Sequence, residues 1–324
     1  MTKKLLFAAT AALAISSCTQ VEVDEVAATQ KEPIRFEQFI NKATRADDVT
    51  TATLTEFYVL GKKYTSDGQS EDINITVTKS GSGWTCDPVV YWEEGAKYCF
   101  AATNYSTGVT FSGTETDYQL QSGEIDGYSA RNNDMVVAIC PNAIEGKATG
   151  NSPISLNFKH ALAKVQVTFV WDREASSSSE VYMPKIESIE RNSAFTLSNK
   201  SSQATWQGTG NNDDSMFSSS IEFNQKSESK TETLLVFPQD DTNFTPKLTF
   251  QIHDENVIGL SESIECDLFT GGVTEWEAGK VYKYKITIGT FARETLEFNA
   301  TVSGWTDNTE TDLGSGNYHS ESIF

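Results

Sequence analysis

Apolar and polar residues alternate along most of this chain, and the alternation predicts strands separated by turns. Residues 73–78 and 296–302 are the clearest cases, because every second residue in them is apolar. A period of two places successive side chains on opposite faces of a sheet, as in a half-buried strand. No segment shows three turns of helical periodicity. The pattern therefore predicts an all-β chain of two tandem β-sandwich domains.

Two segments depart from simple alternation. Residues 135–140 form a continuous apolar run that Pro141 ends, which predicts a strand buried on both faces. Residues 154–170 alternate at both ends, with a turn or a single helical turn expected at 160–164. Polar and turn-forming residues at 141–152 predict a linker. We therefore expect domains at 46–145 and 152–305, followed by a polar tail at 306–324.

The first 17 residues have the organisation of an export signal. Lys3 and Lys4 precede an apolar run, 5–15, that is too short to span a bilayer. The run ends in Ile-Ser-Ser-Cys at 15–18, which resembles the lipobox of bacterial lipoproteins. That resemblance implies cleavage before Cys18 and a diacylglycerol on its thiol. The alternative is an ordinary secretory signal in which Cys18 is incidental.

Residues 18–45 predict a tether and then a strand. An acidic stretch follows Cys18, and the segment 34–40 alternates, with Ile34, Phe36 and Phe39 as its apolar contacts. Arg45 follows among small and polar residues, where a protease could reach it. The alternative is that Arg45 merely lies in a linker.

The net charge of the chain limits the kinds of molecule that it is expected to bind. The formal net charge is −20 and no basic cluster occurs, which disfavours nucleic acid and anionic lipid surfaces. Apolar residues make up 38% of the chain, enough for packed cores. No second apolar run is long enough to cross a bilayer, so a lipid on Cys18 is the expected anchor.

The remaining cysteines allow three pairings of Cys86, Cys99, Cys140 and Cys266. Cys86 and Cys99 lie on neighbouring predicted strands, which is compatible with a disulfide between them. Buried free thiols are the alternative. No Cys or His spacing typical of a metal site occurs, so no metal is expected.

Motifs for catalysis are absent, and the chain is not expected to be an enzyme or to need a cofactor. None of the three histidines lies in a recognisable catalytic motif, and His160 is expected to be structural at a turn. Trp84, Trp92, Trp206 and Trp276 could line a sugar platform. Core or edge positions are the more common place for tryptophan in a sandwich.

Several motifs together resemble the fimbrillin family, the lipoprotein pilins of outer-membrane fimbriae. They are the lipobox, Ala-Thr-Arg-Ala at 43–46, Leu-Asn-Phe-Lys-His-Ala-Leu-Ala-Lys-Val at 156–165, the Trp-x-x-Gly-Lys-x-Tyr-x-Tyr stretch at 276–284, and Val-Ser-Gly-Trp at 302–305. The resemblance implies transthyretin-like sandwiches, an outer-membrane and cell-surface location, and other fimbrial subunits as partners. It also implies that an arginine-specific protease cuts between Arg45 and Ala46, which removes the strand at 34–40 and allows strand exchange.

The family places donor strands at the C-terminus, and residues 295–305 are the best candidate here. Leu296, Phe298, Ala300 and Val302 share one face of that segment. The competing interpretation makes it the last strand of its own domain. For function, the resemblance favours a structural or adhesive fimbrial subunit. The alternative is a surface-exposed lipoprotein that binds glycans or serves nutrient uptake.

Overall fold

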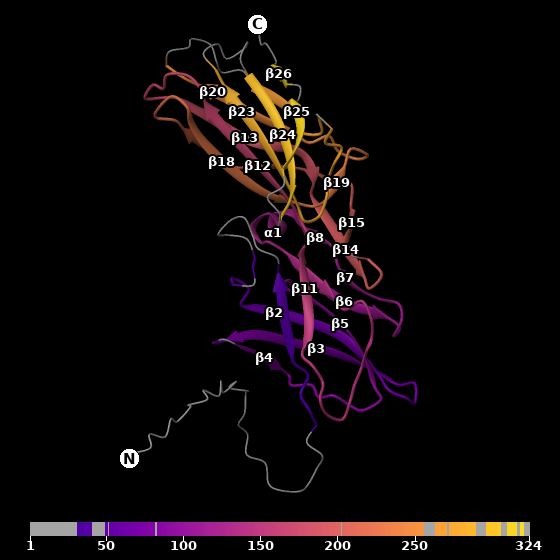
Figure 1. Cartoon of the computed structure of the whole chain (residues 1–324). Coiled ribbons are helices and arrows are strands. Elements are labelled where there is room, and N and C mark those ends of the chain that lie inside the picture. The colour runs from indigo at the N-terminus through magenta and orange to yellow at the C-terminus, as the bar shows by residue number, and fades with distance from the viewer. Residues whose placement is uncertain are drawn as a thin grey trace, which may run out of the picture.

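The computed structural model describes residues 31–40, 49–50, 52–81, 83–201, 203–255, 263–270, 272–289, 296–305, 310–315 and 318–320. Strands dominate these residues, and the only helix among them is α1 (Gly127–Asn132). The all-β prediction is therefore confirmed. The molecule is elongated, with a first sheet at one end, a sandwich at the other end, and α1 between them (Figure 1).

The first sheet carries apolar cores on both of its faces. Val136 and Ala138 face a first core that includes Phe57, Phe100 and Phe158. The adjacent Met135 and Val137 face another core on the opposite side, which we call the third core because the second lies in the sandwich described below. The prediction of a strand buried on both faces is thus confirmed. In spatial order the sheet consists of β1 (Phe36–Ile40), β11 (Ile154–His160), β9 (Val136–Ile139), β5 (Lys97–Thr103), β2 (Glu56–Tyr64), β3 (Ser70–Ser80) and β4 (Gly83–Asp87), with β10 (Ile144–Glu145) on β5.

A second sheet covers the third core and draws its strands from two distant parts of the chain. Its order is β15 (Thr205–Gly208), β14 (Asn192–Ser198), β7 (Tyr118–Ser122) and β6 (Val109–Gly113), with β8 (Ile125–Asp126) on β14. Both β11 and β14 follow the predicted linker at 141–152, yet both pair with strands that precede it. Residues assigned to the second domain from sequence therefore complete sheets of the first, because alternation predicts a strand without naming its partner.

Two further sheets face each other around the second core. Phe169 of one sheet and Phe250 of the other have ring centroids 5.2 Å apart. The sheet with Phe169 is β18 (Glu228–Val236), β12 (Ala163–Trp171), β23 (Lys280–Ile288), β24 (Leu296–Gly304) and β25 (Glu310–Ser315). The sheet with Phe250 is β16 (Asn212–Met216), β13 (Glu180–Glu190), β20 (Lys247–His253), β21 (Ser263–Asp267) and β26 (Tyr318–Ser320), with β17 (Ser220–Glu222) on β13. The pair β19 (Gln239–Asp240) and β22 (Glu275–Trp276) forms a separate ribbon.

Residues 160–164, which we call the junction, join the first sheet to the sandwich. All five residues are buried, including His160 and Lys164. The two residues between β11 and β12 are held by backbone hydrogen bonds: the Ala161 N–H donates to Met135 O over 2.8 Å, and Leu162 O accepts from the Gly279 N–H over 2.8 Å. The indole N–H of Trp206 donates to Ala161 O over 2.6 Å. The second sheet, β9 and the β22–β23 turn therefore all contact this connection.

We expect Gly61→Ala to destabilise the first sheet. A Cβ at this position of β2 would lie 2.2 Å from the carbonyl oxygen of Cys99 on the adjacent β5, so the two strands would have to separate. Overpacking of this kind costs about 1–3 kcal/mol. Gly83→Ala is the matched control, because the nearest atom to its Cβ lies 3.9 Å away. Equal urea midpoints for the two variants would contradict the prediction.

Candidate functional site

β1 lies at the edge of the first sheet and pairs with one neighbour. Its register against β11 is parallel and runs from Phe36 opposite Ile154 to Ile40 opposite Phe158. In the described part of the chain no strand pairs with its other side. A parallel neighbour cannot be joined by a tight hairpin, so β1 has no short covalent link to the strand it pairs with.

The residues that lead into β1 are held on two sides. The Ile34 N–H donates to Val90 O over 2.8 Å, and the Trp92 N–H donates to Glu32 O over 2.9 Å. The backbone and side-chain N–H groups of Asn151 each lie 3.0 Å from Glu32 Oε2. These hydrogen bonds from Asn151 lower the pKa of Glu32. The segment thus lies between residues 90–92 and β11, with backbone hydrogen bonds to both.

Every second residue of the segment points into the first core. Ile34, Phe36 and Gln38 are 2%, 4% and 8% exposed, whereas Arg35 and Glu37 are exposed. The ring of Phe36 meets Phe100 edge-on at a centroid distance of 5.4 Å. The sequence had suggested Phe39 as a third contact. Phe39 pairs with Asn157 in the β1–β11 register, but its side chain lies outside the described residues. Gln38 was not anticipated.

The free energy of this packing matters for removal of the strand. Burial of Ile34 and Phe36 contributes about 3–6 kcal/mol, taking about 1.5–3 kcal/mol for each side chain. A whole domain is stable by about 5–15 kcal/mol. Loss of β1 would therefore remove a large part of the stability and expose apolar walls together with the unpaired edge of β11.

The predicted processing residues lie outside the described part of the chain. These are Cys18, Arg45 and Ala46. The segment 41–48 begins after Ile40, the last residue of β1, and ends before Val49. The Val49 N–H donates to Asp134 Oδ2 over 2.8 Å, and Val49 packs against the first core. The chain on either side of Arg45 is therefore fixed to the first sheet.

The Asp134 carboxylate also holds the junction. Its Oδ1 lies 3.0 Å from His160 Nδ1, with both side chains almost fully buried. The His160 ring stacks on Trp305 at 4.2 Å and 3°, and Lys164 Nζ lies 4.2 Å from the centre of a Trp305 ring. The contacts link the chain just past Arg45 to the residue before the tail. Sequence reasoning placed His160 at a turn but had no signal for Asp134.

The donor-strand prediction does not fit the position of residues 296–304 in this structure. They form β24, which lies inside a sheet between β23 and β25. Phe298 and Ala300 are 2% and 1% exposed in the second core, and Val302 packs against it. Leu296 lies on β24 opposite Ile288, but its side chain is not among those described. The competing interpretation, a strand of its own domain, agrees with these contacts.

The predicted Cys86–Cys99 disulfide is also wrong for this structure. Cys99, Cys140 and Cys266 are buried free thiols. Strands β4 and β5 are neighbours in sequence, but β3 and β2 lie between them in the sheet. Three strand spacings separate the two cysteines by at least about 14 Å, whereas a disulfide needs Cα atoms within about 7 Å. The alternative of buried free thiols therefore holds for Cys99, Cys140 and Cys266.

Other site types were sought among the same residues. No group of His, Cys, Asp and Glu in the described segments could hold a metal ion. None of the described helical structure has the length and apolar character to cross a membrane. Trp92 and Trp276 are buried in the cores, so they form no exposed sugar platform.

A family profile and several solved structures are similar to this chain. A family profile described as fimbrillin-like matches residues 44–305. A proposed cell adhesion protein from Bacteroides uniformis is 17% identical, and the match covers 85% of this chain and 99% of that one with a TM-score of 0.56. For a proposed cell adhesion protein from Bacteroides ovatus the identity is 15%, the coverages are 86% and 99%, and the TM-score is 0.51. The comparison with curated proteins gave no match.

We expect Phe36→Ala to destabilise the uncut chain by about 3–5 kcal/mol, because it leaves a cavity against Phe100. Glu37→Ala, one residue along on the exposed face, should change stability by less than about 0.5 kcal/mol. Urea denaturation gives both values. Hydrogen exchange at the Ile154 amide, which donates to Arg35 O, should also quicken in Phe36→Ala. Equal stabilities for the two variants would contradict the assignment of β1 to the first core.

The cysteines should be protected from alkylation until the protein unfolds. Burial raises the pKa of the Cys99, Cys140 and Cys266 thiols to about 12 each, so almost no thiolate is present at pH 8. Iodoacetamide should therefore leave these three unmodified in the native chain and modify them in urea. Peptide mapping by mass spectrometry tells the sites apart. A Cys86–Cys99 crosslinked peptide under non-reducing conditions would contradict the structure.

Proposed function

The chain belongs to the fimbrillin-like family, and from this premise we propose that it is a structural or adhesive subunit of a cell-surface fimbria. In this proposal the chain is exported as a lipoprotein, held in the outer membrane by the lipid on Cys18, and assembled by strand exchange. An arginine-specific protease cuts between Arg45 and Ala46, and the next subunit's strand takes the place of β1.

The observation that carries the proposal is the position of β1. It is an edge strand with one paired neighbour, and Phe36 in β1 and Ile34 just before it lie in the first core. Its departure leaves an apolar groove beside the unpaired edge of β11. An extended segment of another chain can restore both the hydrogen bonds and the burial by β-augmentation.

The contacts on either side of Arg45 support a clean separation. β1 ends at Ile40, and the next described residue, Val49, is held by the Asp134 carboxylate. A cut after Arg45 would therefore release β1 as part of the N-terminal piece and leave Val49 attached. The incoming strand must come from another subunit by a segment other than β24, which is paired on both sides.

We expect Arg45→Ala to hold the protein as an uncut monomer, because a protease specific for arginine has no site between β1 and Val49. Lys42→Ala is the matched control, since it removes the other basic residue of the same segment and should be cut normally. N-terminal sequencing and gels of unheated surface material give the two readouts. A chain of Arg45→Ala that begins at Ala46 and forms a heat-sensitive ladder would refute the proposal.

The groove itself can be tested on cut protein. A synthetic peptide of residues 31–40 should occupy it and stop the ladder from growing. The same peptide carrying Phe36→Asp should not, because it would bring a carboxylate against Phe100. Equal inhibition by both peptides would show that the groove of β1 is not the assembly site.

A further inference from the structure

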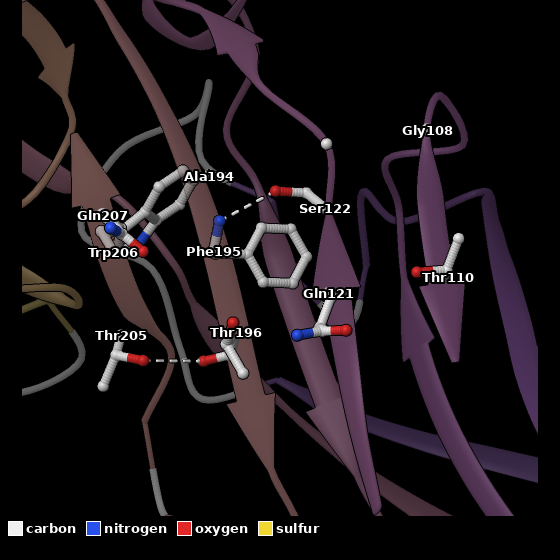
Figure 2. Close-up of a pocket in the computed structure, with 11 residues that line it drawn as sticks. Gly108, Thr110, Gln121, Ser122, Ala194, Phe195, Thr196, Thr205, Trp206 and Gln207 are labelled. Carbon is white, nitrogen blue, oxygen red and sulfur yellow. Dashed lines mark hydrogen bonds between the residues drawn. The ribbon is translucent and has the colours of Figure 1, made fainter. Parts of the chain in front are cut away.

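The outer face of the second sheet forms a trough with a volume of about 730 Å³. Thr110, Gln121, Thr196 and Thr205 stand in a row across its four strands, since the registers pair Thr110 with Gln121, Gln121 with Thr196, and Thr196 with Thr205. Figure 2 shows this row, with Ala194 and Gln207 beside it. Adjacent members stand about 4.8 Å apart, which is the spacing of strands in a sheet.

The chemistry of the trough is neutral and hydrogen-bonding. None of the residues that line it is charged, although the chain has 25 basic and 45 acidic residues. Hydroxyls and amides both donate and accept hydrogen bonds. In the described structure the side chains of Thr110, Thr196 and Gln207 make no hydrogen bond, while Thr205 Oγ1 donates to Thr196 O over 3.2 Å. Gln121 Oε1 accepts from Ser112 Oγ over 3.3 Å, so the groups available along the row are the Gln121 amide N–H groups and the Thr110 and Thr196 hydroxyls.

The aromatic residues under the trough belong to the third core. Phe195 is 1% exposed, and the half-buried Trp206 packs on Phe195 and Phe237 at centroid distances of 5.5 and 5.0 Å. The Trp206 indole N–H is used by Ala161 O. The trough is thus a rigid polar surface on an apolar support, and it offers no large apolar patch to a lipid or an amphipathic helix.

We propose that this trough binds a neutral glycan chain that lies across the four strands, with Thr110, Gln121, Thr196 and Thr205 each meeting one sugar. The strand spacing is close to the length of one pyranose ring, and sugar hydroxyls also donate and accept. A net charge of −20 repels anionic glycans and leaves neutral ones unaffected. This binding goes beyond the assembly role and uses a different sheet, so either can fail without the other.

The test uses the full-length chain in a detergent that carries no sugar. The probes are cellohexaose, laminarihexaose and mannohexaose, with hexagalacturonate as the anionic comparison. Saturation-transfer NMR detects binding, and calorimetry measures the dissociation constant. At least one neutral probe should bind, and Thr196→Val should weaken it about tenfold, because the hydroxyl is lost while the shape is kept. Thr78→Val makes the same change on the exposed face of β3 and should have no effect.

A second variant distinguishes a loss of binding from misfolding of Thr196→Val. Ala194→Arg places a long side chain in the trough from an outward position, and it should abolish binding while the unfolding midpoint and polymer formation stay unchanged. Three results would overturn the proposal: no signal from any neutral probe, equal binding of hexagalacturonate, or binding that both trough variants leave unchanged.

Discussion

The structure depends on the burial of the junction. Only Ala161 and Leu162 separate the first sheet from the sandwich, and β11 and β12 run directly into them. A buried carboxylate and a buried ammonium are costly unless each has a partner. Asp134 has the Val49 amide and His160, and Lys164 lies over Trp305. The His160 ring stacks on Trp305 at 4.2 Å, so the residues around Asp134 and those around Lys164 meet at the junction and couple the first sheet to the sandwich.

That coupling bears on the proposed removal of β1. The junction, β9 and β5 keep the first sheet in register through contacts that do not involve β1. β1 and the residues leading into it add burial of Phe36 and Ile34 in the first core. In the proposed assembly, the sheet would lose this stabilisation when β1 leaves and would regain it when another strand takes its place.

The neutral trough lies on the face of the second sheet that is turned away from the third core. The second sheet must bury Phe195, Leu120 and Leu197 on one face to cover the third core. Its other face is then free to carry side chains of any kind, and along the trough it carries hydroxyls, amides and small residues. Because no charged residue lines this surface, a neutral ligand can bind there without displacing or pairing with a charged side chain. The trough lies on a different sheet from the β1 groove.

The sequence by itself determined the class of fold and the strands, because side-chain alternation with period two is a local property of each segment. It placed Ile34 and Phe36 on a strand ahead of Arg45, and it identified residues 135–140 as buried on both faces. The predictions that disagree with the structure concern which segments of the chain pair with each other. Cys86 and Cys99 are close in sequence but two strands intervene, β11 and β14 join sheets from before the predicted linker, and β24 is internal rather than free. Gln38, Asp134 and the row of threonines gave no signal, since their roles come from residues far along the chain. Only the tertiary structure decides which strands meet, because the free energy of pairing depends on surfaces that the local pattern does not encode.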